Sequence, residues 1–256
     1  MPRAPKTEKL SKQQMLKQLI CSDERERALR GQGYCVIAGV DEVGRGALFG
    51  PVVAAAVILP ESMNRLARAG LTDSKQLTAS RREELDHEIR QAALAVSIAE
   101  VDAGTIDRVN IYQATRMAML AAVEGLAMKP DHLLIDAMLL DHPCAQTKLI
   151  YGDALSLSIA AASVVAKVYR DALMCRLDAE YPGFGLASHK GYATAAHRQA
   201  LAAQGPTVLH RRSFAPVRAL VLDDGVFPFS TAPTARPIPA QGEALGTGSP
   251  TRDQGL

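Results

Sequence analysis

Tryptophan is absent from this chain of 256 residues, aromatic residues make up only 4% of it, and its apolar runs are short. No run approaches the ~18 apolar residues that a membrane span needs, which argues against a transmembrane protein. The four cysteines form no C-x-x-C pair, so neither a zinc site nor a disulfide framework is expected. The first residues, MPRAPKTEKLSKQQMLKQ, contain no apolar signal core. We therefore expect a cytoplasmic protein with reduced thiols.

Shifts in composition divide the chain into three parts. With 48% hydrophobic residues it can bury one sizeable core, which we place in residues 34–222. Residues 1–33 are a basic extension, either a solvated helical segment or an arm that binds nucleic acid. Residues 223–256 are rich in proline, glycine, serine and threonine, and we expect a disordered tail there. The net charge of +2 is too small to indicate nucleic acid by itself.

The central part alternates between strand and helix patterns. Apolar and β-branched runs predict strands, and 3.6-residue periodicity predicts helices; the strands cover 35–41, 52–59, 94–101, 131–135 and 147–151, and the helices 78–92, 105–128, 156–179 and 192–204. The short turn between the first two strands suits an antiparallel pair, and helices between the later strands imply parallel pairing. The predicted fold is α/β: one mixed five-stranded sheet with flanking helices and a small C-terminal helical region.

Four carboxylates come at or just after predicted strand ends. Asp41 and Glu42 follow the first strand, Asp136 ends the strand LLID, and Asp153 follows LIYG. Functional groups gather where parallel strands end, and carboxylates that meet there repel one another unless cations lie between them. Such hard oxygen ligands suit Mg²⁺ or Mn²⁺. Each of the two later aspartates also has a structural interpretation, as a helix cap for Asp153 and as a turn residue for Asp136.

A cluster of four carboxylates can hold two metal ions, the arrangement used for in-line displacement at phosphorus. One geometric objection concerns Asp41 and Glu42, because successive strand residues point to opposite faces of a sheet. We expect the strand to break at this point, with the turn from Gly44 to Gly46 bringing Glu42 around. The same turn does not fit a dinucleotide site, because its glycines are spaced G-x-G-x-x-x-G and the two carboxylates would repel a pyrophosphate.

Acidic residues are missing altogether between Tyr181 and Leu222, a segment that holds Lys190, four arginines and three of the six histidines. It is either a solvated basic face or a surface that follows a phosphate backbone, and the neighbouring carboxylates favour the second interpretation. Elsewhere, Ser74, Lys75 and Lys167 are candidate contacts to phosphate. Lys167 alternatively forms an ordinary helix pair with Asp171, four residues further on.

Five blocks of the sequence resemble the motif series of ribonuclease HII in order and approximate spacing. They are GVDEVGRGALFGPVVAAAVIL, DSKQL, LLIDA, GDALSLSIAAASVVAKVYRD and YPGFGLASHKGYATAAHRQAL…GPTVLHRRSF, and they cover about residues 34 to 222. The resemblance implies a ribonuclease H-like fold and two divalent ions. It also implies an endonuclease that cleaves the RNA strand of RNA–DNA hybrids, and single ribonucleotides embedded in duplex DNA, leaving 3′-hydroxyl and 5′-phosphate ends.

The resemblance also assigns roles to residues. By motif, the family's catalytic carboxylates fall on Asp41, Glu42, Asp136 and Asp153. Its ribose-contacting turn falls on Gly44, Arg45 and Gly46, and its junction-sensing tyrosine falls on Tyr192. The family pattern commonly has glycine after the third carboxylate, where this chain has Ala137.

The sequence thus predicts a monomeric, metal-dependent endoribonuclease with RNA–DNA hybrids and ribonucleotide-containing duplex DNA as partners, and no membrane. A contact with a replication clamp stays open at this stage. One alternative is another ribonuclease H-like nuclease or strand-transferase, which shares the carboxylates but has no need of a ribose-reading turn. Another is a non-catalytic module that binds nucleic acid, which needs the basic segment but not the acidic cluster.

Overall fold

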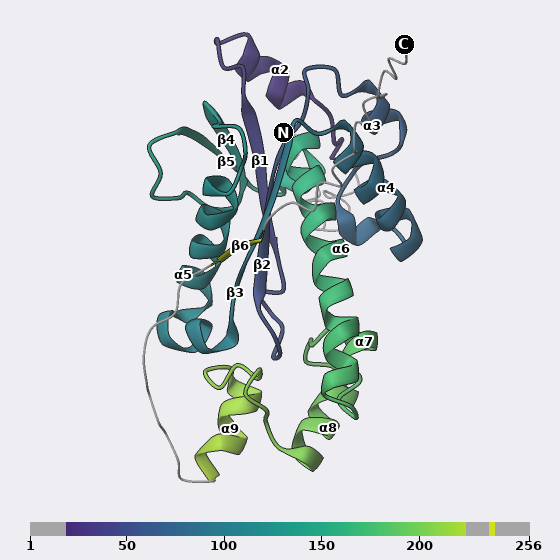
Figure 1. Ribbon diagram of the computed structural model, residues 1–256, viewed down its shortest axis with the longest axis vertical. Helices are drawn as coiled ribbons and strands as arrows, with labels where there is room; N and C mark the ends of the chain where they lie inside the picture. Colours follow the sequence, from purple (N-terminus) through teal and green to yellow (C-terminus); the bar gives the residue numbers. More distant parts are fainter. Residues whose placement is uncertain (1–18, 224–235, 239–256) are drawn as a thin grey trace, which may run out of the picture.

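The computed structural model describes residues 19–223 and 236–238, and it has a central sheet between two layers of helices (Figure 1). The sheet order is β5-β4-β1-β2-β3-β6. The strands are β1 (Ile37–Val43), β2 (Val52–Ile58), β3 (Ala95–Val101), β4 (His132–Asp136), β5 (Ala145–Leu149) and β6 (Arg236–Ile238). Among the described residues, no helix is long and apolar enough to cross a membrane.

Helices connect and flank these strands. In chain order they are α2 (Glu24–Arg30), α3 (Asn64–Arg68), α4 (Ala79–Ala92), α5 (Ala103–Glu124), α6 (Leu157–Glu180), α7 (Leu186–His189), α8 (Ala195–Gln204) and α9 (Ala215–Asp223), with 3-10 turns η1 (Ser74–Gln76) and η2 (Gly152–Ala154). Helices α7, α8 and α9 form the predicted C-terminal helical region, at the bottom of Figure 1.

Strand pairing agrees with the expected mixed sheet. β1 pairs antiparallel with β2, and β2 antiparallel with β3, while β1, β4 and β5 are parallel. The link between β4 and β5, residues 137–144, contains no helix, in line with the predicted helices, so the parallel pairing of these two strands does not depend on one. As β1 and β4 are parallel neighbours, their carboxyl ends lie at the same edge of the sheet.

Two apolar clusters cover the two faces of the sheet. Alternate residues of β2 divide between them: Ala54 and Ala56 pack toward α5, while Val53 and Val57 pack toward α4 and α6. Helix α6 lies unusually close to β1, since a Cβ added at Gly39 would lie 2.0 Å from the backbone of Ser158. The absence of a side chain at Gly39 therefore sets how near α6 comes to the strand that carries Asp41.

Part of the predicted basic extension belongs to the folded core. Helix α2 contributes Glu26, which is fully buried and accepts hydrogen bonds from Ser156 Oγ (2.6 Å) and from the backbone N–H of Ser158 (2.9 Å). Ser22 also forms a parallel bridge with Ser156. A carboxylate from the extension thus satisfies donors in the first turn of α6, where it also complements the helix dipole. Residues 1–18 of the extension lie outside the described residues.

The predicted disordered tail contains an unexpected strand. Residues 236–238 pair antiparallel with β3 as β6, at the opposite edge of the sheet from β5. The five predicted strands are therefore extended by one short strand. Backbone pairing at a sheet edge makes few demands on side chains, and for that reason composition gave no sign of it. Residues 224–235 and 239–256 lie outside the described residues.

Replacing Glu26 with alanine should destabilise the fold. The change leaves the Ser156 hydroxyl and the Ser158 N–H buried without an acceptor, so we expect Glu26→Ala to lower the free energy of unfolding by about 2–4 kcal/mol. The exposed Glu24 on the same helix provides the control, and Glu24→Ala should cost about 0.5 kcal/mol or less. Urea denaturation of both variants measures the difference. Equal effects of the two variants would show that Glu26 does not anchor α6.

Candidate active site

Three carboxylates meet at the edge where β1 and β4 end. Asp41 and Glu42 are on β1, and Asp136 is the last residue of β4. One oxygen of each lies within 4.8 Å of an oxygen of the other two. Among the described residues, no other group of three or more histidine, cysteine, aspartate or glutamate side chains has a spacing that could hold a metal ion. It joins side chains that are adjacent in space because their strands are parallel neighbours.

The expected break in the first strand does not occur. β1 continues to Val43, with Asp41 opposite Ala55 and Glu42 opposite Ala54, so the two carboxylates start from opposite faces of the sheet. They meet because this is the end of the strand and because the Glu42 N–H donates to Asp41 Oδ1 (2.7 Å). That bond draws the Asp41 carboxylate along the strand toward its neighbour. The expectation of a break was wrong because it ignored this local hydrogen bond.

Asp136 is held by the backbone of η2. The Gly152 N–H donates to Asp136 Oδ1 at 2.7 Å. A Cβ at Gly152 would lie 2.6 Å from Ile159 Cδ1 and 3.2 Å from the same carboxylate oxygen, so a side chain there would have to displace Ile159 and crowd Asp136. The following residue, Ala137, has a φ of 53°, in the left-handed region that glycine adopts more readily. The departure from the family pattern therefore introduces strain beside the third carboxylate.

Asp153 lies in η2, next to this group but not within it. Its carboxylate is nearly buried and pairs with Lys75 Nζ at 3.3 Å. The Asp153 charge nevertheless acts on Asp41, whose pKa it helps to raise. The structure thus brings three of the four predicted carboxylates into one cluster and places the fourth beside it, bridged to a lysine.

Burial governs the electrostatics of the cluster. Desolvation raises the pKa of Asp41 well above its ordinary value, and the charges of Glu42, Asp136 and Asp153 raise it further. Burial also raises the pKa values of Glu42, Asp136 and Asp153. Each of the three has a neighbour that lowers its pKa: Arg45 for Glu42, the Gly152 N–H for Asp136 and Lys75 for Asp153. Burial and mutual repulsion thus make the charged form of each carboxylate less favourable than in an isolated group, and a bound divalent ion would offset both effects.

A cavity of about 420 Å³ opens beside the cluster, lined by Glu42, Val43, Ser74, Lys75, Ser163, Lys167 and Tyr192. The hydroxyls of Ser74 and Ser163 hydrogen-bond each other at 2.9 Å. Lys75 is the most exposed of the cations near the carboxylates; burial lowers its pKa, but Asp153, Asp73 and Asp41 outweigh that effect and raise it. The cavity therefore brings one carboxylate of the cluster, that of Glu42, together with two lysines, Lys75 and Lys167.

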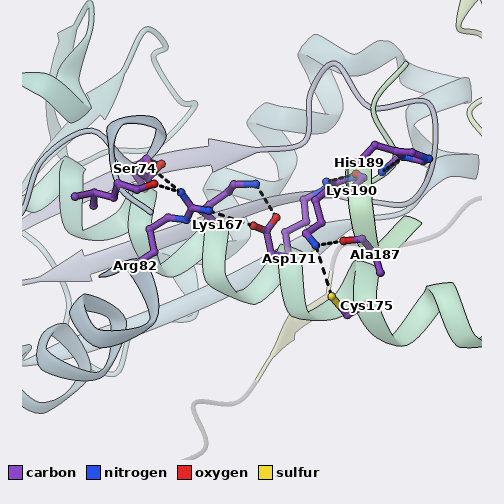
Figure 2. A network of polar contacts seen from close by, with 12 residues as sticks. Ser74, Arg82, Lys167, Asp171, Cys175, Ala187, His189 and Lys190 are labelled. Atoms are coloured by element: carbon purple, nitrogen blue, oxygen red, sulfur yellow. Dashed lines mark hydrogen bonds and ion pairs between the residues drawn. The ribbon is translucent and has the colours of Figure 1, made fainter. Parts of the chain in front are cut away.

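Two of the predicted phosphate contacts are engaged within the protein. Lys167 Nζ donates to Asp171 Oδ1 at 2.6 Å, and Arg82 approaches the same carboxylate at 3.8 Å (Figure 2). The helix pair considered from the sequence is therefore present, although Lys167 also lines the cavity. Lys190 donates to the Ala187 carbonyl and to Cys175 Sγ (Figure 2), and it does not line the cavity.

The glycine turn follows β1 directly after Glu42 and Val43, which line the cavity. Arg45 pairs with Glu42 at 3.2 Å, and Gly46 is exposed. A Cβ added at Gly46 would have Tyr192 Cε1, at 3.9 Å, as its nearest neighbour, so the turn and the tyrosine border the same space. Tyr192 precedes α8, which begins at Ala195 and not at the predicted position 192. Its carbonyl accepts a hydrogen bond from His197 Nδ1 (2.9 Å).

Sequence reasoning missed Ser163 and Asp73. The Ser163 hydroxyl lowers the pKa of Asp41, and Asp73 lies 3.9 Å from Lys75. Ser163 could have been found as a polar residue on the sheet-facing side of an otherwise apolar helix. Asp73 carries no such signal, because an aspartate before a short turn is common.

Comparisons with known proteins agree with this geometry. The family model described as ribonuclease HII matches residues 38–217. The chain belongs to the ribonuclease HII family. A ribonuclease HII from Koribacter versatilis is 52% identical over 230 residues, which cover 89% of this chain and 89% of that protein. The chain is accordingly a ribonuclease H endonuclease that depends on divalent metal.

Solved structures place the fold in the same group. Ribonuclease H2 from Pyrococcus horikoshii OT3 matches with a TM-score of 0.66 and 26% identity, covering 73% of this chain and 98% of that one. Bst-RNase HIII, solved in complex with Mn²⁺, matches with a TM-score of 0.56 at 19% identity, covering 87% of this chain and 77% of that one. The predicted ribonuclease H-like fold is confirmed.

Removing one charge from the cluster should stabilise the metal-free protein. Since folding raises the pKa of Asp41, the folded state holds a proton that the unfolded state releases, and stability falls as pH rises above ~4 toward neutrality. We expect Asp41→Asn to raise the melting temperature at pH 8 in a chelator by about 2–4 °C for each kcal/mol of relieved repulsion. The gain should shrink as pH falls toward 5.

The exposed Asp141 supplies the control for that measurement, and Asp141→Asn should leave the melting temperature unchanged at both pH values. Added Mg²⁺ should reverse the order, stabilising the parent chain more than Asp41→Asn. A lower melting temperature for the metal-free Asp41→Asn variant at pH 8 would contradict the repulsion described for this cluster.

Asp153 and Asp171 are rival candidates for a fourth ligand, and the geometry favours Asp153. Asp171 lies eight residues along α6 from Ser163, which hydrogen-bonds Asp41, a separation of about 12 Å at 1.5 Å per residue, and it is paired with Lys167 and Arg82. We expect Asp153→Asn to lower turnover at least tenfold more than Asp171→Asn. Initial rates of hybrid cleavage at saturating Mg²⁺ measure this, and the reverse order would show that Asp171 is the ligand.

Proposed function

We propose that Asp41, Glu42, Asp136 and Asp153 bind two divalent ions, Mg²⁺ or Mn²⁺. With them, the chain would hydrolyse the RNA strand of RNA–DNA hybrids and cut duplex DNA at single embedded ribonucleotides. The observation that carries this proposal is the approach of three carboxylate oxygens within 4.8 Å at the rim of a cavity with cationic walls. Bound divalent ions would supply Lewis-acid stabilisation and a water of lowered pKa.

The residues around the carboxylates have separate roles in this proposal. Lys75 is the exposed cation nearest the cluster, and it would contact a substrate phosphate while it neutralises Asp153. Ser74 and Lys167 line the same cavity and would fix the position of a second phosphate oxygen. Lys190 would contact the phosphate backbone further out, after releasing the Ala187 carbonyl. Phosphate contacts of this kind position a duplex without reading its sequence.

Discrimination between ribose and deoxyribose would come from the turn and the tyrosine. The 2′-hydroxyl is the group that distinguishes the two sugars, and backbone groups can read it by hydrogen bonds. Gly46 is exposed beside Tyr192, so a sugar can approach the backbone of Gly44, Arg45 and Gly46 without meeting a side chain at position 46. Tyr192 would stack on the neighbouring deoxyribose and hydrogen-bond the 2′-hydroxyl of the ribonucleotide.

The alternatives explain less of this arrangement. A non-catalytic module that binds nucleic acid has no use for carboxylates buried against one another. A strand-transferase would use the carboxylates but not an exposed glycine turn beside a tyrosine. The 52% identity with a ribonuclease HII over most of both chains also supports the nuclease.

A DNA duplex with one ribonucleotide tests the proposal directly. We expect a single cut at the ribonucleotide, leaving 3′-hydroxyl and 5′-phosphate ends, that stops in a chelator and returns with Mg²⁺ or Mn²⁺. Asp136→Asn, which keeps the side-chain shape but removes a charge, should lose turnover and still bind the duplex. A cyclic phosphate product, or equal cutting of an all-DNA duplex, would refute the proposal.

Changing Tyr192 tests how the junction is sensed. Tyr192→Ala should fold and bind metal normally. Its cleavage rate at a lone ribonucleotide should fall by a factor at least ten times larger than the fall in its duplex affinity, because the ring and hydroxyl contacts are both removed. Tyr192→Phe keeps the ring and should fall between. Single-turnover rates and duplex binding measure the two quantities. Cleavage by Tyr192→Ala at the parent rate would place junction sensing elsewhere.

A further inference from the structure

Two arginines are fully buried behind the glycine turn. Arg170 on α6 and Arg211, just before α9, are both 0% exposed. Burial of a guanidinium is costly unless its donors are satisfied, and buried arginines usually pair with carboxylates. The hydrogen bonds of these two side chains go to backbone carbonyls instead. Arg211 Nη2 has no partner among the described residues.

The carbonyls that accept these bonds belong to the two segments that border the cavity. Arg170 donates to Phe49 and Pro51 in the connection from β1 to β2, and to Lys190, two residues before Tyr192; the distances are 3.1, 3.1 and 2.9 Å. Arg211 donates to Arg45 and Gly50 of the same connection, both at 2.9 Å. The Arg170 guanidinium therefore links the turn segment to the tyrosine segment, in addition to the backbone contacts that join Leu48 to Gly191 (2.8 Å) and Ala47 to Tyr192.

The glycine turn rests directly on this side chain. A Cβ added at Gly44 would lie 2.2 Å from Arg170 Nε, and Gly44 has a φ of +88°. On its other side, the Arg170 guanidinium lies 5.7 Å from the centre of the Tyr192 ring. The glycine at position 44 is thus required by the packing of Arg170, whereas the exposed glycine at position 46 leaves room for substrate.

We propose that Arg170 and Arg211 are positioning residues that set the distance between the Gly44–Gly46 turn and Tyr192, and so align a ribonucleotide junction with the carboxylates. This inference rests on the proposed function, because it assigns a task to groups that would contact substrate. Three carbonyls at fixed directions match the fork of an arginine, whereas a lysine ammonium is a single point that cannot span both segments. A displacement of about 1 Å in such a site can cost roughly a hundredfold in rate.

Burial lowers the pKa of both guanidinium groups, that of Arg211 to about 9, so both stay protonated at neutral pH. Repulsion from Arg170 adds to the lowering of the Arg211 pKa, while the carboxylates of Asp107 and Asp171 act in the opposite direction, on Arg211 and Arg170 respectively. Two positive charges beneath the turn also favour a phosphate backbone above it. A lysine substitution keeps these charges while it removes the fork, which separates alignment from attraction.

The experiment compares Arg170→Lys with the parent chain on a duplex that contains one ribonucleotide. We expect the single-turnover cleavage rate at saturating metal to fall at least tenfold, while the duplex Kd stays within threefold because the charge is kept. Arg211→Lys, which releases only Arg45 and Gly50, should show a smaller loss in rate. Gly44→Ala should lower the cleavage rate less in the Arg170→Lys background than in the parent chain. Its Cβ acts by displacing the Arg170 guanidinium, which the lysine variant already lacks.

A destabilised control separates alignment from general loss of stability. Leu126→Ala removes apolar packing at the end of α5, away from the turn, and should lower the melting temperature but keep the cleavage rate within twofold below that temperature. A rate within twofold of the parent for Arg170→Lys, or an equal rate loss in Leu126→Ala, would overturn the inference. So would failure of both lysine variants to fold. If the parent chain itself does not cut this duplex, the proposed function fails instead.

Discussion

The repulsion among buried carboxylates at the ends of β1 and β4 is the constraint on which the rest of this site depends. Parallel pairing brings Asp136 to the edge where Asp41 and Glu42 lie, and the close approach of α6 over Gly39 keeps water away from Asp41. Each carboxylate then has a raised pKa, with burial as the main cause. A divalent ion relieves this repulsion, and so the fold itself generates the affinity for metal.

Positive and polar groups compensate only part of that repulsion. The N–H groups of Glu42 and Gly152 donate to the cluster, and Lys75 and Arg45 each pair with one carboxylate at its rim. Neither cation reaches the buried centre of the cluster. The site is thus left electrostatically incomplete toward the cavity, on the side where a phosphate backbone and its metal ions would arrive. Stability is sacrificed there to gain binding, as is common at active sites.

Sequence patterns predicted the five-stranded mixed sheet because apolar, β-branched runs and helical patterns alternate clearly between residues 35 and 180. They also indicated which carboxylates would meet, since strand ends share an edge. What they could not reveal depends on contacts between distant residues. Glu26 was assigned to a solvated extension, but its carboxylate caps α6 across 130 positions. The bond from the Glu42 N–H to Asp41 removed the need for a strand break. Arg211 was counted in the basic segment from Tyr181 to Leu222 and Arg170 was given no role, although both side chains are buried.

The central claim is that this fold holds its carboxylates together for divalent ions, and direct counting of bound Mn²⁺ by electron paramagnetic resonance tests it. The account predicts saturable binding by the full chain at pH 8 and weaker binding as the pH is lowered, because protons compete with the metal for carboxylates whose pKa values are raised by burial. It also predicts that Asp136→Asn loses most of that binding. Absence of saturable binding by the parent chain, or equal binding by Asp136→Asn, would contradict the account.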